Sequence, residues 1–352
     1  MNPVGEQEET ILKITKTDAA EKRQLIIFLS VAFALPYMMG ILMGYAYYRG
    51  IDVSCFPNAQ MYYPAAGVML AALLVKKEDK LVPKKFYLCF ITITVLLLLL
   101  TVGSVFLPAT GMLFAGLNMI ITFGSLVSWI FLLAEKKENR EAYGLRAHNG
   151  KISVLMVILF LLLYFGRIFL MYIAGGQLDE FIDVFKSPVT YRILFVLPIN
   201  FFLVFTAFFG EEYGWRYYFT PLLQQHFGKV KGILLLGILW GLWHLPVNVF
   251  YYSPHTWLQS IVSQQITCIG MGIFFTYTYL KTNNIWVPVI LHFLNNNLVV
   301  ILNSGNAGAI NNQLISWADV LLLLILNLVL FVPFILTKEF RGAEKYTGKT
   351  AD

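Results

Sequence analysis

The sequence predicts an all-α fold, a polytopic bundle of about ten transmembrane helices with both termini in the cytosol. Composition is the first reason: of the 352 residues 58% are hydrophobic and only 13% are charged, whereas soluble domains are about a quarter charged. The second reason is that apolar runs of about 18 residues or more recur along the chain. These observations exclude a soluble protein and a nucleic-acid-binding protein. The net charge of +6 requires no anionic partner, because the basic residues lie between the apolar runs.

The apolar segments follow a polar tail, Met1–Gln24, and are separated by polar or basic loops. No small-residue cleavage pattern follows the first segment, so we interpret it as a retained span and not as a signal peptide. Pro36 is expected to bend that span. In order, the expected spans are Leu25–Tyr48, Phe56–Val75, Phe86–Leu107, Met112–Ala134, Ile152–Ala174, Ile193–Gly210, Gly232–Phe250, Trp257–Leu280, Ile285–Leu302 and Trp317–Leu336.

Lysine and arginine residues predict the orientation of these spans. They occur in both terminal tails and in the loops after the second, fourth, sixth and eighth segments, whereas the opposite loops carry few beyond Arg49, Lys186 and Arg192. Because cytosolic loops are enriched in basic residues, this alternation places both termini in the cytosol. The two halves of the chain show no repeat, which argues against a transporter built from inverted repeats.

Two adjacent carboxylates and an arginine stand at the end of the sixth segment. These residues, Glu211, Glu212 and Arg216, are costly in lipid unless they are paired, hydrated or used. Glu212 and Arg216 have the i, i+4 spacing of an ion pair within one helix. Glu211 lies about 100° further round the helix and can face the interior. We therefore expect the sixth helix to continue through the carboxylate pair.

Two histidines lie inside later apolar segments, where an ionisable residue indicates a functional site. These are His244 and His292, each with a partner at helical spacing. Trp240 precedes His244 by four residues, and Asn296 follows His292 by four, so that both members of the second pair can point at one substrate atom. Pro246 is expected to free a backbone carbonyl near His244. The remaining histidines are interpreted as solvated loop residues; they are His148, His226 and His255.

This set of side chains suits hydrolysis by either of two routes. In the first, Glu211 acts as a general base on a water molecule. In the second, Glu211, His244 and His292 hold zinc or another divalent metal ion with an open position for water. The zinc-protease helix motif His-Glu-x-x-His is absent, so such a site has to be assembled from three helices. In either route Asn296, with or without His292, donates to the developing oxyanion.

Other polar residues in the apolar segments have structural interpretations. The cysteines lack metal or redox spacing and are expected to be small buried side chains. Arg167, in the fifth segment, is expected to extend toward the outer face or to pair with a carboxylate of the acidic loop Gly175–Arg192. Three asparagines are expected to form hydrogen bonds between helices; they are Asn200, Asn295 and Asn297.

The motifs Glu-Glu-x-x-x-Arg, aromatic-x-x-x-His and His-x-x-x-Asn, each in or beside an apolar segment, together resemble the CPBP family. This family of intramembrane proteases includes the type II CAAX prenyl endopeptidases and the bacterial Abi proteins. The resemblance covers Tyr191 to Asn303. It implies that Glu211 and His244 activate the water, and that His292 and Asn296 stabilise the oxyanion or share in metal binding.

The same resemblance implies that Glu212 and Arg216 support the site. The second family motif usually begins with Phe, and here it begins with Trp240. We interpret this as a volume change that affects substrate shape more than chemistry. The chain then divides as follows: 1–24, N-terminal tail; 25–189, N-terminal membrane helices; 190–305, catalytic membrane core; 306–352, last membrane helix and basic tail.

The sequence therefore predicts an intramembrane endopeptidase, a multi-pass protein of the cell membrane with its active site open to the cytosol. Its expected partners are the lipid bilayer and a peptide or small membrane protein, such as a prenylated C-terminus or a pheromone or bacteriocin precursor; no nucleic acid and no particular oligomeric state is predicted. The alternatives are a non-proteolytic membrane scaffold or regulator of the same fold and, third, a proton-coupled transporter. Confinement of the polar groups to the last five segments argues against the transporter.

Overall fold

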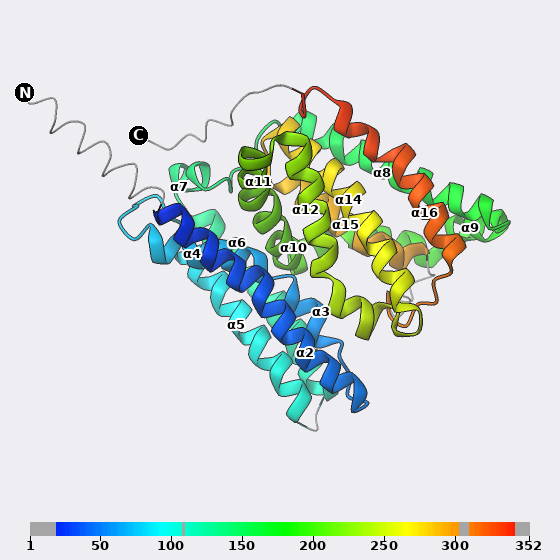
Figure 1. The fold of residues 1–352 in the computed structure, drawn as a ribbon, viewed down its shortest axis with the longest axis horizontal. Coiled ribbons are helices and arrows are strands. Elements are labelled where there is room, and N and C mark those ends of the chain that lie inside the picture. The colour runs from blue at the N-terminus through cyan, green and yellow to red at the C-terminus, as the bar shows by residue number, and fades with distance from the viewer. Residues whose placement is uncertain (1–18, 108–109, 303–309, 342–352) are drawn as a thin grey trace, which may run out of the picture.

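The computed structural model describes residues 19–107, 110–302 and 310–341. Within these ranges every regular element is a helix and no strand occurs, which confirms the all-α prediction. The N-terminal helices pack together on one side of the bundle, and the C-terminal helices form the other side (Figure 1). Helix α10 packs against α4 and α6 on the first side and against α15 on the second. The expected tails and turns at 1–18, 108–109, 303–309 and 342–352 lie outside the described residues.

The first half of the bundle begins with a helix at Ala19 that passes through a π-helical turn directly before Pro36. Two short helices fill the place of the second expected span, and two long helices follow. The elements are η1 Ser30–Ala34, α2 Leu35–Tyr48, α3 Cys55–Gln60, α4 Tyr63–Val75, α5 Lys84–Phe106, α6 Thr110–Ala134 and α7 Lys137–Ala142.

The second half contains a long helix that carries the carboxylate pair and a bent helix that carries His244. Its elements are α8 Gly150–Ala174, α9 Leu178–Lys186, α10 Pro188–Glu212, η2 Tyr213–Phe219, α11 Thr220–Phe227, α12 Lys229–Trp243, α13 Leu245–Val247, η3 Asn248–Tyr252, η4 Pro254–Thr256, α14 Trp257–Thr282, α15 Trp286–Leu302, α16 Trp317–Leu330 and η6 Val332–Leu336.

Among the described residues, 7 helices are long and apolar enough to cross a membrane, or up to 8 if the bent pair α12 and α13–η3 forms one span. The chain is thus a multi-pass membrane protein. Two of the ten expected spans correspond to shorter helices: α4 has 13 residues and α15 has 17. A helix of 13 residues is about 20 Å long, shorter than a hydrocarbon core of about 30 Å. The count of ten and the cytosolic termini remain predictions.

The helix that contains the sixth expected span is longer than that span and does not end at Gly210. Helix α10 leads through the π-helical segment η2 into α11, giving one 40-residue helix, Pro188–Phe227. The prediction that the helix continues through the carboxylate pair is confirmed. Glu211 lies about 24 Å before the end of this helix, and its place at the end of the membrane span remains a prediction. The helix continues because its charged groups are buried and paired with one another, so they do not need water.

The backbones of the long helix and of α4 approach closely at two glycines. A Cβ atom on Gly214 would lie 2.8 Å from the carbonyl carbon of Pro64, and one on Gly210 would lie 3.0 Å from the Cα atom of Tyr62. Backbone atoms cannot turn aside as a flexible side chain can. Only glycine therefore permits this approach, which sets the depth of the helix in the bundle just beside Glu211 and Glu212.

We expect Gly214→Ala to destabilise the protein by about 1–3 kcal/mol, the usual cost of overpacking a close contact. Gly166→Ala is the matched control, because a Cβ atom at Gly166 on α8 would meet no atom within 4 Å, and alanine favours the helix. Thermal unfolding of both variants in detergent gives the comparison. Equal midpoints for the two variants would show that the contact with α4 is loose.

Candidate active site

Glu212 is held by two cationic or ionisable partners from different helices. The Nε atom of Arg216 forms an ion pair with Oε2 of Glu212 at 3.1 Å, and Nη1 donates to Oε1 at 3.2 Å. The Nε contact is an ion pair without hydrogen-bond geometry. The Nδ1 atom of His292 on α15 lies 2.8 Å from the same Oε1. All three side chains are buried. The predicted ion pair within the helix is confirmed, and His292 extends it to a second helix.

Glu211 has a different environment from its neighbour. Its Oε2 accepts a hydrogen bond from Nε1 of Trp240 at 2.8 Å and a longer one from Nε1 of Trp215 at 3.4 Å. Only 2% of Glu211 is exposed. Both donors are uncharged, so they orient the carboxylate without neutralising it. Of the two adjacent glutamates, Glu212 is thus ion-paired and Glu211 is held by indoles.

His244 stands where helix α12 ends and the chain bends by 43° into α13 and η3. Its backbone N–H donates to Gly241 at 3.2 Å instead of to Trp240. The carbonyl of Trp240 is therefore free to accept from Nδ1 of the His244 ring, at 2.8 Å. This bond places the ring proton on Nδ1 and leaves Nε2 to accept a proton. Pro246, which has no N–H, follows at the start of α13.

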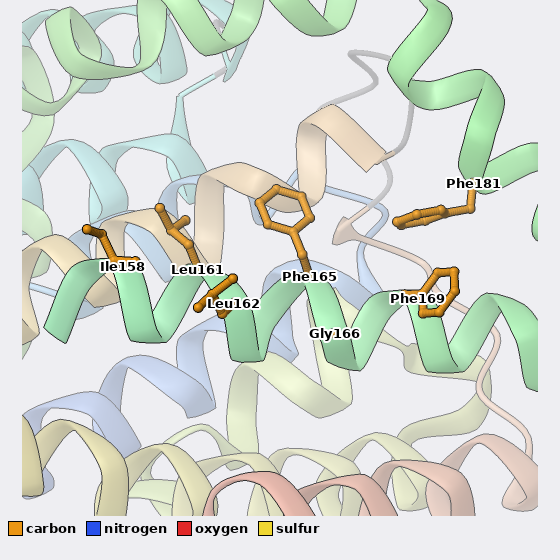
Figure 2. A pocket seen from close by; sticks show the side chains of 7 residues that line it. All are labelled: Ile158, Leu161, Leu162, Phe165, Gly166, Phe169 and Phe181. Atoms are coloured by element: carbon orange, nitrogen blue, oxygen red, sulfur yellow. The ribbon is translucent and has the colours of Figure 1, made fainter. Parts of the chain in front are cut away.

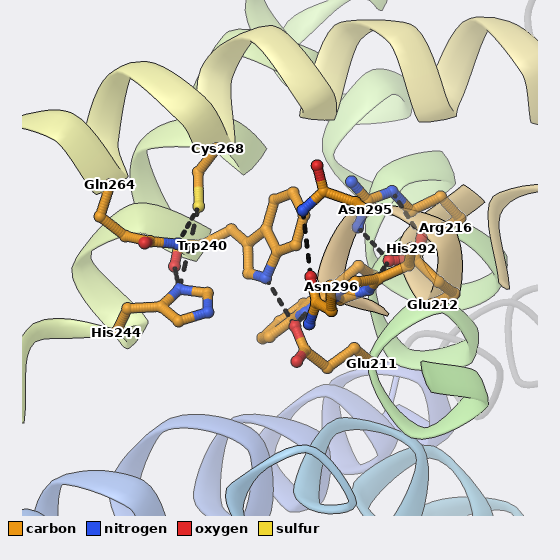
Figure 3. A network of polar contacts seen from close by, with 11 residues as sticks. Glu211, Glu212, Arg216, Trp240, His244, Gln264, Cys268, His292, Asn295 and Asn296 are labelled. Atoms are coloured by element: carbon orange, nitrogen blue, oxygen red, sulfur yellow. Dashed lines mark hydrogen bonds and ion pairs between the residues drawn. The ribbon is translucent and has the colours of Figure 1, made fainter. Parts of the chain in front are cut away.

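The indole of Trp240 is the point at which the three helices meet (Figure 3). Its ring centroid lies 6.0 Å from that of His244 and 5.8 Å from that of His292. The guanidinium carbon of Arg216 lies 4.3 Å from the same centroid. Glu211, through its hydrogen bond, completes this group. The structure thus brings together the sixth, seventh and ninth expected segments, as the shared-site prediction requires.

Asn296 differs from these buried residues because it is exposed. Its Oδ1 accepts a hydrogen bond from Nδ2 of Asn295 at 3.0 Å, and no acceptor among the described residues takes a hydrogen bond from its own Nδ2. His292 turns toward Glu212, so the described contacts do not direct His292 and Asn296 at one atom. Asn200 donates to Asn297 at 3.3 Å, as predicted for an interhelical bond. Asn295 instead bonds to its neighbour in the same helix.

The donor atoms of the predicted metal ligands suit a divalent cation. His244 and His292 both have Nδ1 held by an acceptor, the arrangement that leaves Nε2 for a metal. Within 19–107, 110–302 and 310–341, however, no three His, Cys, Asp or Glu side chains lie close enough together to hold a metal ion. The Trp240 indole stands between the two imidazoles. The arrangement therefore does not fit a three-ligand site, and we derive no reaction step through a metal.

Arg167 is buried and does not extend to the outer face, so that prediction is wrong. Its guanidinium lies over Tyr164 and Phe331, at 5.2 and 5.9 Å from the ring centroids. Among the described residues no carboxylate pairs with it. Asp183, which lies on helix α9 and not in a loop as expected, pairs with Lys186 at 2.8 Å. Aromatic faces thus replace the expected carboxylate partner.

An apolar cavity of about 420 Å³ lies along α8, with Phe181 of α9 among its lining residues (Figure 2). Its lining residues are Ile158, Leu161, Leu162, Phe165, Gly166, Phe169 and Phe181. None of them titrates or acts as a nucleophile, so the cavity supplies no chemistry for hydrolysis.

Two features of the site were not predicted from the sequence. Trp215 is one turn from Glu211, and the i, i+4 spacing that identified the pair of Glu212 and Arg216 also applies to it. Cys268 on α14 lies with its sulfur 3.8 Å from Nδ1 of His244. The cysteines are free, as expected; Cys55 and Cys268 are buried, and Cys89 is partly buried.

A buried glutamate and two histidines, joined inside a multi-pass helical bundle, are the groups expected of an intramembrane peptide hydrolase. A family model described as type II CAAX prenyl endopeptidase Rce1-like matches residues 193–298. The chain is 30% identical over 202 residues to the CAAX prenyl protease 2 of Methanococcus maripaludis, covering 52% of this chain and 72% of that protein. No solved structure matches. This chain belongs to the family of CAAX prenyl proteases of type II, as the resemblance of its motifs implied.

We expect Arg216→Met to lower the free energy of unfolding by about 3–5 kcal/mol, because it leaves the buried charge of Glu212 without its main partner. Lys186→Met is the control, since it breaks an exposed pair with Asp183 at 2.8 Å, and exposed pairs contribute little. Denaturant unfolding in detergent measures both. A variant of Arg216 as stable as the control would contradict the importance of the buried pair.

Proposed function

We propose that this chain is an intramembrane endopeptidase that hydrolyses a peptide bond of a membrane-associated substrate. The observation that carries the proposal is the contrast between the two glutamates. Glu212 is ion-paired with Arg216 and hydrogen-bonded to His292, whereas the hydrogen bonds that Glu211 accepts from the described residues come from uncharged indoles. Glu211 therefore presents an oriented carboxylate that is not used in an ion pair, on the same indole that contacts both imidazoles. Membership of a protease family supports the same conclusion.

In the proposed reaction, Glu211 accepts a proton from a water molecule as the water oxygen attacks the substrate carbonyl carbon. His244, with Nε2 unprotonated, is a second acceptor near this water. The π electrons of the carbonyl move to its oxygen, which becomes an oxyanion, and Nδ2 of Asn296 donates a hydrogen bond to this oxyanion. When the C–N bond breaks, the stored proton passes to the departing amine. The products are a carboxylic acid and an amine, with no other reactant consumed.

His292 has a conditional role in this reaction. Because Nδ1 donates to ionised Glu212 at 2.8 Å, a neutral His292 has no proton on Nε2 and cannot donate to an oxyanion. Only the doubly protonated ring can do so. We therefore propose Asn296 as the principal hydrogen-bond donor to the oxyanion. His292 would be a second donor only when its ring is doubly protonated.

The substrates we propose are prenylated C-termini, leader-type peptide precursors and small membrane proteins. The relative from Methanococcus maripaludis is named a CAAX prenyl protease, which supports the first of these. A prenyl or apolar anchor holds its peptide at the bilayer, where a buried site can reach it. From the distribution of Lys and Arg between the loops, we propose that the protein lies in the cell membrane and that the site opens toward the cytosol.

We expect Glu211→Gln to lower kcat by at least about 100-fold, because glutamine cannot accept the proton. The substitution keeps the shape of the side chain, so the fold should persist. The measurement is cleavage of a fluorogenic prenylated peptide by protein reconstituted in vesicles. His226→Ala is the control, because His226 is exposed on α11, away from the site. Full activity of Glu211→Gln would refute the protease proposal and favour the scaffold.

We further propose that catalysis proceeds without a metal ion, since the candidate ligands are not gathered at one point. Cleavage should then be unchanged after dialysis against a strong chelator, with metal content followed by mass spectrometry. Activity that disappears on chelation and returns with zinc would overturn this proposal and would require His244, His292 and Glu211 to rearrange.

A further inference from the structure

Two buried indoles share one oxygen atom of the candidate general base. Trp215 is 0% exposed and Trp240 is 4% exposed. An indole has a single N–H donor, and a buried indole usually finds an acceptor for it. Both donate to Oε2 of Glu211, Trp215 at 3.4 Å and Trp240 at 2.8 Å. The two donors come from different helices, η2 and α12, so the carboxylate is held from two directions.

The packing around each indole fixes the direction of its N–H group. Trp215 packs edge to face against Trp243, with ring centroids 5.5 Å apart, and also against Phe33 at 5.5 Å. Trp240 lies under the guanidinium of Arg216 at 4.3 Å and beside Phe275 at 6.4 Å. Neither ring can turn without displacing buried neighbours. The two N–H groups are therefore preorganised and need not be recruited by the substrate.

We propose that Trp240 and Trp215 are positioning residues that clamp Oε2 of Glu211, so that Oε1 is the oxygen that takes the proton from water. This inference rests on the proposed function, because it gives Glu211 the role of general base. An ion pair would neutralise the carboxylate, as Arg216 does for Glu212. The clamp fixes the rotation of Glu211 and adds no opposing charge to the carboxylate. Geometry of this kind lowers the barrier by orienting the base before the substrate arrives.

The clamp gives position 240 a chemical role that its volume alone does not. The motif resemblance places Phe there in most members, and the sequence suggested only an effect on substrate shape. Phenylalanine offers the same face to Arg216 and to the imidazoles but has no N–H for Glu211. Trp240→Phe therefore removes the proposed function of the residue while keeping most of its packing.

Trp286→Phe is the matched control. Trp286 stands at the start of α15, where its ring stacks on Trp129 and Phe209, and its N–H donates at 2.9 Å to the backbone carbonyl of Leu145. Both substitutions thus remove one indole hydrogen bond of similar length. A purely structural role of Trp240 predicts the same loss in both variants. A positioning role predicts a loss of kcat in one of them only.

We expect Trp240→Phe to lower kcat by about 10-fold to 100-fold, the worth of a hydrogen bond to a charged group, with KM unchanged. Trp215→Phe should have a smaller effect, because its bond is longer, and the double variant should lose the most. In the Glu211→Gln background, Trp240→Phe should cause no further loss. A kcat for Trp240→Phe equal to that of Trp286→Phe would overturn the proposal.

A spectroscopic readout separates this inference from the protease proposal. The chain has 7 tryptophans, and ¹⁵N-indole labelling with single Phe variants assigns the three N–H signals of interest. Glu211→Gln should move the signals of Trp240 and Trp215 and leave that of Trp286 in place. Unmoved signals would overturn the clamp even if the protein cleaves peptides. Unchanged cleavage by Glu211→Gln would instead overturn the proposed function and, with it, the positioning role.

Discussion

The buried contact of Glu212 with Arg216 and His292 is the interaction on which the rest of the site depends. Two adjacent glutamates inside an apolar helix would each carry a large desolvation cost. Arg216 offsets that cost for Glu212 from one helical turn away, and His292 joins from α15. Because Arg216 also lies over the Trp240 ring, the same charge cluster fixes the helix that carries His244. Three helices are thereby joined around one ion pair.

This arrangement gives two identical side chains different roles. The carboxylate of Glu212 is used to hold the helices together, and that of Glu211 is oriented by neutral donors and takes no part in an ion pair with the described residues. Two carboxylates of the same chemical type can take different roles because their surroundings differ. The glycines beside the pair add to this division, because Gly210 and Gly214 allow α4 to pack against the long helix. Close packing excludes water from the ion pair and limits the motion of the base.

The sequence alone predicted the helical class, the pair of Glu212 and Arg216 and the continuation of the sixth helix. These are local properties: they depend on hydropathy and on i, i+4 spacing. It did not predict where that helix ends, because burial of its charged residues by other helices decides this. The predicted partner of Arg167 was wrong for the same reason, since the rings of Tyr164 on α8 and of Phe331, directly after α16, take the place of a carboxylate.

The direction of a side-chain atom also depends on tertiary packing. Spacing could place Trp240 near the site, but only the structure shows its N–H on Glu211. Likewise, His292 was predicted as a catalytic group without its bond to Glu212, because that bond joins residues 80 positions apart. The sequence also left the metal site open for this reason. It shows which residues could bind a metal ion, but only the folded structure shows whether those residues lie close together.

The tautomer of His292 tests the central contact most directly. The chain has 5 histidines, so ¹⁵N-histidine labelling yields a spectrum simple enough to assign with single variants. We predict a proton on Nδ1 of His292 that is hydrogen-bonded to Glu212 and is perturbed in Glu212→Gln. A His292 ring with its proton on Nε2 alone, or one insensitive to Glu212→Gln, would contradict the account, because Glu212 would then not be held from α15.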